Sequence, residues 1–231
     1  MKVIKKVLLI IPIVILLTSL LFIKKDNTKK VLLLGDNVNI KTYLQEKLEN
    51  FEVEEFTFSK MKSKDLLYYV TSNASISFEN KKKTINELIK SSDYIVISIG
   101  LNDILSKIVL NKYEKRITYD KDNMDLAFSI LEQNLFNIAE HIKLINDKTN
   151  IILTSYDDPF IFLEKEDENH MLIKNLNSLM NSISVLFSGN YLEINLNNKD
   201  YYDDEFSFFL NEEGKQKIAE NIYQKIVAIN Q

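Results

Sequence analysis

The fold is decided by one stretch of the chain, Val31-Leu32-Leu33-Leu34-Gly35-Asp36-Asn37. Four apolar residues lead directly into a glycine and two short polar residues. A continuous apolar run that ends in a turn signal is typical of a buried strand in a parallel sheet. In open α/β sheets, ligands bind at the carboxyl ends of the strands. We therefore expect Asp36 and Asn37 to lie at a ligand-binding edge.

A second strand of the same kind ends at another glycine. Residues 93–99 run into Gly100-Leu101-Asn102-Asp103. The chain has only four glycines, and glycine is the residue that tolerates positions where a side chain would clash. Because two of the four follow apolar strands, both turns are expected to be specified by the sequence. Asn102 and Asp103 thus join Asp36 and Asn37 as candidate ligand-binding residues.

The rest of the chain alternates strands with helices. Strands are expected at residues 31–35, 52–58, 94–99, 150–154 and 191–195, and helices at 41–50, within 59–70, and at 84–90, 104–110, 122–147, 166–187 and 212–229. Residues 71–82 are expected to form a polar loop. The apolar stripe of the longest helix is assigned to Leu126, Ile130, Leu135, Ile138, Ile142 and Ile145. This order predicts one α/β domain with helices on both faces of a five-stranded parallel sheet.

Residues 1–30 differ in character from the domain at residues 31–231. Lysines flank an apolar run from Val7 to Ile23 on both sides, and its 17 residues are near the lower limit for a membrane-spanning helix. No small-x-small cleavage motif follows the run. Since the run also lacks a polar face, we expect an uncleaved transmembrane anchor with a short tether, rather than a cleaved signal peptide or a core helix. The expected location is the cell membrane, crossed once, and lysines on both sides of the run leave its orientation open.

Composition excludes several kinds of partner. Residues 1–30 hold seven Lys and one Asp, so the remaining residues carry 22 basic and 32 acidic side chains, a net charge of −10. A domain this acidic is a poor candidate for binding nucleic acid. The absence of Cys removes disulfides, thiol catalysis and thiolate metal sites. No cofactor is expected.

The turn residues resemble the SGNH/GDSL hydrolase family, near its bacterial lipase/acylhydrolase members. In that family the first strand ends in Gly-Asp-Ser, with the Ser as nucleophile, and a later strand ends in Gly-x-Asn-Asp. Here the first block reads Gly35-Asp36-Asn37, and the block at residues 100–103 is intact. The stretch Tyr156-Asp157-Asp158-Pro159-Phe160 is similar to the Tyr-Asn-Pro-Phe stretch of those relatives. The resemblance covers about residues 30–230 and implies a three-layer α/β/α, flavodoxin-like fold. By analogy with secreted relatives, it also implies that the N-terminus lies inside and the domain outside the cell membrane.

The same resemblance argues against the usual chemistry of the family. Its last block reads Asp-x-Phe-His-Pro-Asn-x-x-Gly, and residues 206–214 match it at Phe208, Asn211 and Gly214. Phe209 stands where the family has its His, and Phe206 where it has its Asp. Asn37 stands where it has its Ser, and an amide nitrogen is not a nucleophile at neutral pH. The glycine that supplies a second oxyanion donor is also missing after the second strand.

Several roles stay open at this point. Asn37 is either a ligand contact or a turn residue, and Asn102 either stabilises an oxyanion or holds its loop. His170 is a candidate substitute base, whereas His141 is expected to be a surface or boundary residue of the long helix. Ser59, Ser63 and Ser98 are candidate substitute nucleophiles, although none has a visible base partner in the sequence. Aromatic residues near the last block either cover the cleft or line it, namely Tyr201, Tyr202, Phe206, Phe208 and Phe209.

A hard-cation site is a further alternative, built from Asp36 and Asp103 with the acidic group Asp200, Asp203, Asp204 and Glu205. No spacing in this group matches a known metal loop, so no metal is expected. Two functions remain. The first is a catalytically inactive, membrane-anchored envelope domain that binds a ligand or a protein partner. The second is an esterase acting on acyl esters of lipid or cell-wall glycan through non-standard residues.

Overall fold

The computed structural model describes residues 28–37, 39–78, 81–164, 167–187, 189–196, 198–204 and 206–231. The expected anchor at residues 7–23 lies outside these ranges. Within them, no helix combines the length and the apolar character needed to cross a membrane.

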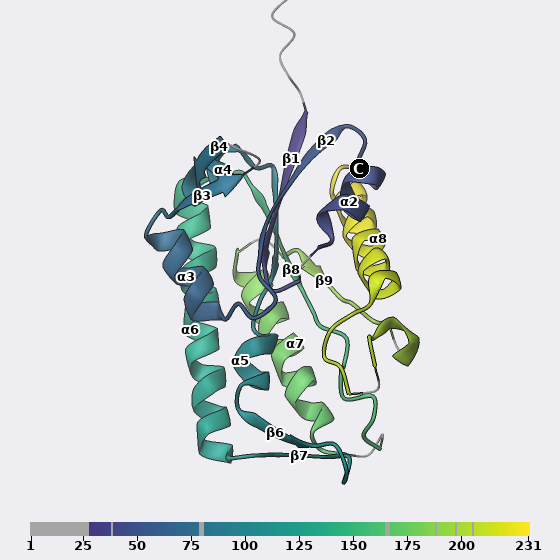
Figure 1. Cartoon of the computed structure of the whole chain (residues 1–231). Helices are drawn as coiled ribbons and strands as arrows, with labels where there is room; N and C mark the ends of the chain where they lie inside the picture. Colours follow the sequence, from purple (N-terminus) through teal and green to yellow (C-terminus); the bar gives the residue numbers. More distant parts are fainter. Residues whose placement is uncertain are drawn as a thin grey trace, which may run out of the picture.

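Five parallel strands form the central sheet, in the order β2-β1-β5-β8-β9 (Figure 1). Their bounds are β1 Lys29–Gly35, β2 Phe51–Thr57, β5 Tyr94–Ser98, β8 Asn150–Thr154 and β9 Tyr191–Leu192. The prediction of a five-stranded parallel sheet is confirmed. The last strand is shorter than expected, because only Tyr191 and Leu192 pair with β8.

Helices cover both faces of the sheet, as Figure 1 shows. One face carries α2 Lys41–Lys47 and α8 Glu212–Ile229, and the other carries α3 Ser63–Thr71, α4 Ile85–Ser91, α5 Leu101–Leu105, α6 Lys121–Ile145 and α7 His170–Phe187. Leu32 and Leu34 pack into the core on the larger side, while Val31 and Leu33 pack under α2 and α8. Burial on both faces is the reason that the first strand reads as an unbroken apolar run.

Two hairpins correct the expected order of elements. Residues 71–82 were expected as a loop, but they contain β3 Ser75–Phe78, which pairs with β4 Lys81–Thr84. The expected helix at 104–110 is also wrong. The helix is α5, and it is followed by β6 Ile108–Asn111, which pairs with β7 Arg116–Tyr119.

The apolar stripe of α6 is rotated from its expected position. Leu126 and Ile130 are 58% and 46% exposed. The buried face instead carries Met124, Ala127 and Leu131, and it continues through Leu135, Ile138 and Ile142 as expected. The buried face was therefore predicted correctly for the second half of α6 and wrongly for its first half.

Candidate functional site

The turns after β1 and β5 meet at one edge of the sheet. The two strands are adjacent, and Gly35 is paired with Ser98. Gly35 has a φ of +123°, and a Cβ atom at this position would lie 1.8 Å from the backbone oxygen of Ser98. The next residue, Asp36, donates its backbone N–H to the same oxygen at 2.7 Å. Glycine is thus required here by both conformation and space.

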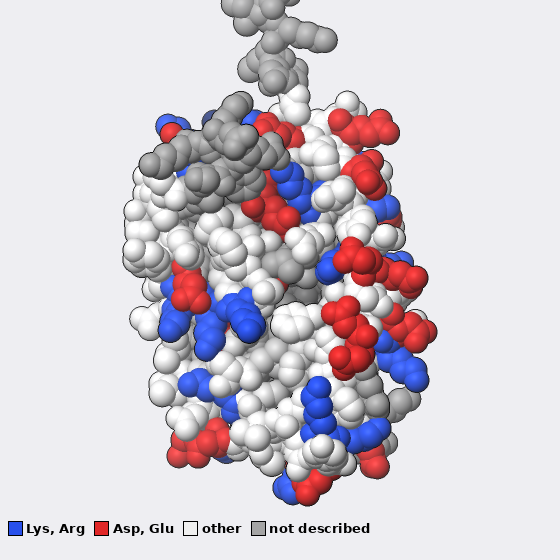
Figure 2. All heavy atoms as spheres, in the orientation of Figure 1, with Lys and Arg blue, Asp and Glu red and all other residues white. Residues whose placement is uncertain are grey.

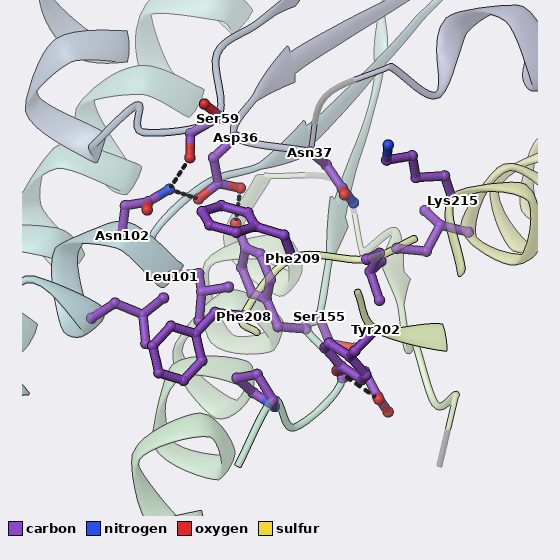
Figure 3. Close-up of a pocket in the computed structure, with 16 residues that line it drawn as sticks. Asp36, Asn37, Ser59, Leu101, Asn102, Ser155, Tyr202, Phe208, Phe209 and Lys215 are labelled. Carbon is purple, nitrogen blue, oxygen red and sulfur yellow. Dashed lines mark hydrogen bonds between the residues drawn. The ribbon is translucent and has the colours of Figure 1, made fainter. Parts of the chain in front are cut away.

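Asp36 is the centre of the site's hydrogen bonds. Its Oδ1 accepts a hydrogen bond from the Tyr156 hydroxyl at 2.5 Å, and its Oδ2 accepts one from the Asn102 amide at 3.1 Å (Figure 3). Burial raises the pKa of Asp36 to about 7, and the two hydrogen bonds oppose that rise only in part. The carboxyl group therefore changes its charge near neutral pH.

Asn102 has its donor hydrogens occupied within the protein. Besides Asp36, its Nδ2 donates to the backbone oxygen of Ser59 at 3.3 Å. A side-chain amide has two N–H hydrogens, so these bonds account for both. An oxyanion at this site would have to displace one of them. The geometry favours a loop-holding role for Asn102 in the unliganded protein.

Asp103 holds the N-terminal end of α3 through Ser63, the first residue of that helix. Its two oxygens accept hydrogen bonds from the Ser63 backbone N–H at 2.9 Å and from the Ser63 hydroxyl at 2.8 Å. The Asn134 amide of α6 donates to the same hydroxyl at 2.9 Å. Burial raises the pKa of Asp103, against these hydrogen bonds. Asp103 does not line the pocket described next.

A pocket of about 80 Å³ opens at this edge of the sheet. Such a volume accommodates a small chemical group, since pockets for drug-sized molecules measure roughly 300–1,000 Å³. It is lined by Asp36, Asn37, Ser59, Leu101, Asn102, Leu105, Ser155, Tyr156, Asp157, Pro159, Tyr202, Phe208, Phe209, Leu210, Lys215 and Ile218 (Figure 3).

The structure brings Asn37 and Phe209 into this same pocket. These are the positions at which the resemblance places a Ser and a His. Phe209 is 46% exposed, so its ring forms part of the rim. The aromatic residues near the last block were expected either to cover the cleft or to line it. Tyr202, Phe208 and Phe209 line the pocket.

Phe206 lies outside the pocket lining. Its ring centroid is 5.1 Å from that of Phe162, and the ammonium groups of Lys112 and Lys115 lie 5.5 and 5.9 Å from it. The neighbouring Phe208 packs edge-on against Phe160 at 5.9 Å. An aromatic ring at position 206 is therefore held by apolar and cation–π contacts.

Both histidines lie outside the pocket lining. His170 has its Nδ1 2.6 Å from Asp158 Oδ2 and its Nε2 2.9 Å from the backbone oxygen of Glu164. His141 lies within α6. No histidine lines the pocket among the residues that the structure describes.

The candidate serines differ in their surroundings. Ser63 is buried and forms the hydrogen bonds to Asp103 described above. Ser98 is also buried, and its Oγ lies 2.6 Å from Thr154 Oγ1. Ser59 alone of the three lines the pocket. Over the described ranges, no group of three or more His, Asp or Glu side chains is arranged to hold a metal ion. Glu205 of the acidic group lies outside those ranges.

Sequence reasoning missed two features of the pocket. Tyr156 was noted only as part of a motif, yet its hydroxyl forms the short hydrogen bond to Asp36. The side-chain amide of Asn177 in α7 bonds both the backbone N–H and the backbone C=O of Tyr156, each at 2.8 Å. Lys215 lines the pocket and forms an ion pair with Glu212 at 2.6 Å. Its position directly after Gly214 in the last block was the available signal.

Comparison with known proteins supports the fold. No family model and no curated protein matches the sequence. A lipase from a goat rumen metagenome has a similar structure, with a TM-score of 0.64 and 19% identity over 86% of this chain and 97% of that chain. A GDSL-like lipase from Bacteroides thetaiotaomicron VPI-5482 is also similar, with a TM-score of 0.58 and 18% identity over 90% of this chain and 91% of that chain.

A third similar structure is a carbohydrate esterase whose active site is described as displaying divergent catalytic and non-catalytic binding functions. Its TM-score is 0.56 and its identity 11%, over 88% of this chain and 68% of that chain. At these identities the likeness concerns the fold. The chain has an SGNH/GDSL hydrolase-like fold.

Proposed function

We propose that this chain, which has an SGNH/GDSL hydrolase-like fold, is a membrane-anchored envelope protein that binds a small acyl group on a glycan without hydrolysing it by a Ser-His-Asp mechanism. One observation carries the proposal. Asn37 and Phe209 face the same pocket, at the positions of the nucleophile and the base. Neither side chain can form an alkoxide or accept a proton.

The pocket suits a small neutral group. Apolar side chains from Leu101, Leu105 and Ile218 make up part of its wall, and the amide of Asn37 supplies polar atoms beside them. An acetyl group has the matching chemistry, since its methyl group needs apolar contact and its carbonyl oxygen accepts a hydrogen bond. The half-exposed ring of Phe209 gives a sugar a surface on which to stack.

Two further points support binding without turnover. The similar carbohydrate esterase is described as having non-catalytic binding functions alongside catalytic ones. In this chain, the side-chain amide of Asn102 already donates its two hydrogens to Asp36 and to the backbone oxygen of Ser59. The apolar run at residues 7–23 supports the anchor. The outward position of the domain is proposed from the resemblance to secreted relatives.

The test is binding by the full chain in detergent. An O-acetylated oligosaccharide and its chemically deacetylated form are titrated by calorimetry, and free acetate is measured in the same samples. We expect tighter binding of the acetylated form, at least fivefold weakening in Asn37→Ala, and no released acetate. Phe58→Ala is the control, because Phe58 is an exposed residue, at 49%, that does not line the pocket. Equal affinity for both sugars contradicts the proposal.

The alternative is an acyl-ester hydrolase with non-standard residues. Ser59 favours it, because Ser59 lines the pocket beside Asn102, and Asp36 titrates near neutral pH in the same cavity. Acetate release that is lost in both Ser59→Ala and Asp36→Asn would establish this alternative. Release that survives both variants points to a contaminating enzyme.

A further inference from the structure

Two hydrogen-bond donors of the pocket wall are directed at Asp36 rather than into the cavity. The Tyr156 hydroxyl donates to Oδ1 of Asp36 at 2.5 Å, and the Asn102 amide donates to Oδ2 at 3.1 Å (Figure 3). Both side chains line the pocket. The other amide hydrogen of Asn102 goes to the backbone oxygen of Ser59 at 3.3 Å. A ligand carbonyl therefore finds the donors of both residues already engaged while Asp36 is ionised.

A proton on Asp36 changes what its carboxyl group can hold. A hydrogen bond to a carboxylate is about twice as strong as one between neutral groups, so the anion binds the Asn102 amide firmly. Because Tyr156 donates to Oδ1, the oxygen left for an added proton is Oδ2, which is the atom that faces Asn102. A protonated carboxyl oxygen is a donor. Protonation thus removes the acceptor that engages Asn102.

Asp36 is placed to change its protonation near neutral pH. Burial raises the pKa of its carboxyl group to about 7, and the charge of Asp103 in α5 acts in the same direction. The hydrogen bonds from Tyr156 and Asn102 lower this pKa, but they offset burial only in part. Both charge states of the carboxyl group are therefore populated near pH 7.

Other titratable groups meet Asp36 in the pocket wall. Burial raises the pKa of Tyr156, so its hydroxyl keeps its proton. Asp157 accepts a hydrogen bond from Tyr202 at 2.9 Å, and Lys215 of α8 forms the ion pair described above. Figure 2 shows acidic side chains gathered over the start of α8, and a negative surface also favours the protonated form of a carboxyl group. No histidine belongs to the described lining, so the change of charge near pH 7 is assigned to Asp36.

We propose that Asp36 is a positioning residue whose proton releases the Asn102 amide to bind the carbonyl oxygen of the acyl group, and whose ionised form withdraws that donor. The inference rests on the proposed function and specifies how the same pocket recognises its ligand. Binding is coupled to the uptake of a proton, so affinity is full when Asp36 is protonated and falls as pH rises through its pKa. The released amide meets a neutral carbonyl, and without a nucleophile at Asn37 no turnover follows.

The test is the pH dependence of binding by the full chain in detergent. A neutral O-acetylated oligosaccharide, which does not titrate in this range, is the probe at pH 6, 7 and 8. For a pKa of about 7, the protonated fraction falls about tenfold between pH 6 and pH 8. We expect the dissociation constant of the natural chain to rise at least fivefold. Calorimetry in buffers of different ionisation heat should record the uptake of about one proton per ligand at pH 8.

Variants separate the proton from the fold. Asp36→Asn cannot ionise and is expected to give an affinity that is constant with pH, whereas Tyr156→Phe is expected to move the midpoint to higher pH. Asp120→Asn is the matched control. Asp120 lies outside the pocket lining and caps α6 by accepting the backbone N–H of Asn123 at 2.9 Å, and asparagine caps a helix equally well. We expect this control to keep the natural pH profile.

A measurement without ligand separates this inference from the proposed function. Crystal structures of the full chain at pH 5 and pH 9 give the distance from Asn102 Nδ2 to Asp36 Oδ2, and we expect a hydrogen bond at pH 9 and none at pH 5. An oligosaccharide that binds at no pH, with the contact broken at pH 5, would refute the proposed function and leave the proton-controlled amide standing. A contact that persists at pH 5, an affinity that is constant with pH in the natural chain, or a pH dependence that survives in Asp36→Asn would overturn the inference.

Discussion

The phenolic oxygen of Tyr156 lies 2.5 Å from Oδ1 of Asp36, and this contact joins the turn after β1 to the segment after β8. The hydroxyl donates to a carboxyl group of a residue that lines the pocket. Two segments 120 residues apart in the sequence are thereby fixed against each other. The state of one proton on Asp36 decides the charge at this junction.

Folding stability is expected to fall as pH rises from about 4 to 7. The pKa of Asp36 is about 7 in the folded protein against an ordinary value of 3.8. Between these values the folded state keeps a proton that the unfolded state has lost, so the free energy of unfolding decreases by at most about 1.4 kcal/mol per pH unit. Urea unfolding of the natural chain and of Asp36→Asn, each at pH 5 and pH 8, measures this effect. Between pH 5 and pH 8 the natural chain should lose roughly 2–3 kcal/mol of stability relative to Asp36→Asn. A difference that is constant with pH would contradict the assignment.

Removing the Tyr156 hydroxyl is expected to raise the pKa of Asp36 further. The hydrogen bond from Tyr156 is the largest influence that lowers this pKa, and its loss leaves the carboxylate less well solvated. Carbon NMR titration of the carboxyl group in Tyr156→Phe measures the shift. Tyr202→Phe is the control, because that hydroxyl donates to Asp157 at 2.9 Å instead. An unchanged Asp36 titration in Tyr156→Phe would show that the contact is not formed in solution.

The glycine at the end of β1 is expected to be irreplaceable. In Gly35→Ala the new Cβ would lie 1.8 Å from the Ser98 oxygen, at a φ of +123°, so we expect destabilisation of more than about 4 kcal/mol, or failure to fold. Gly189→Ala is the matched control. It also has a positive φ, +72°, but beyond its two chain neighbours no atom of the described residues lies within 4 Å of its Cβ, so a loss of only about 1–2 kcal/mol is expected. Thermal unfolding of both variants separates the clash from the backbone strain.

Ser63→Ala is expected to destabilise the site edge by about 1–3 kcal/mol. The change removes the hydroxyl that bonds both Asp103 and Asn134 and leaves these two buried groups without that partner. Ser182→Ala is the control, because the hydroxyl of this exposed residue donates to the backbone oxygen of Ser178 in the same helix. Equal stability of the two variants in denaturant unfolding would show that the Ser63 bonds do not hold the loop.

The sequence was most informative where burial is two-sided. The runs at Val31–Leu34 and at β5 are covered on both faces, so hydrophobicity alone identifies them. β8 and α8 were predicted with their observed bounds, because polar or turn residues flank an unambiguous apolar pattern in each.

The sequence was least informative where local pattern and tertiary contact disagree. Ile108 and Leu110 point to the core with Val109 67% exposed between them, but four residues are too few to separate a strand from the end of a helix. Leu126 and Ile130 show a different limit: their apolar character suggested burial, but their side chains are 58% and 46% exposed.

The candidate site was located by its two turns but not by its partners. Asp36 and Asn102 were expected together because adjacent parallel strands end at one edge. The Tyr156 contact depends on how distant loops pack, and so does the packing of Phe206 against Phe162 outside the pocket lining. Nothing in the spacing of these residues specifies either contact.

The central claim is that the scaffold of the site persists while its nucleophile and base are gone, and ester hydrolysis by the full chain in detergent tests it most directly. Short p-nitrophenyl esters are offered to the natural chain and to the variants Asn37→Ser with Phe209→His, alone and with Phe206→Asp added. We expect no rate above buffer for the natural chain and measurable turnover in the triple variant, because Asn37 and Phe209 already face one pocket. Turnover by the natural chain that disappears in Asn102→Ala would contradict the claim.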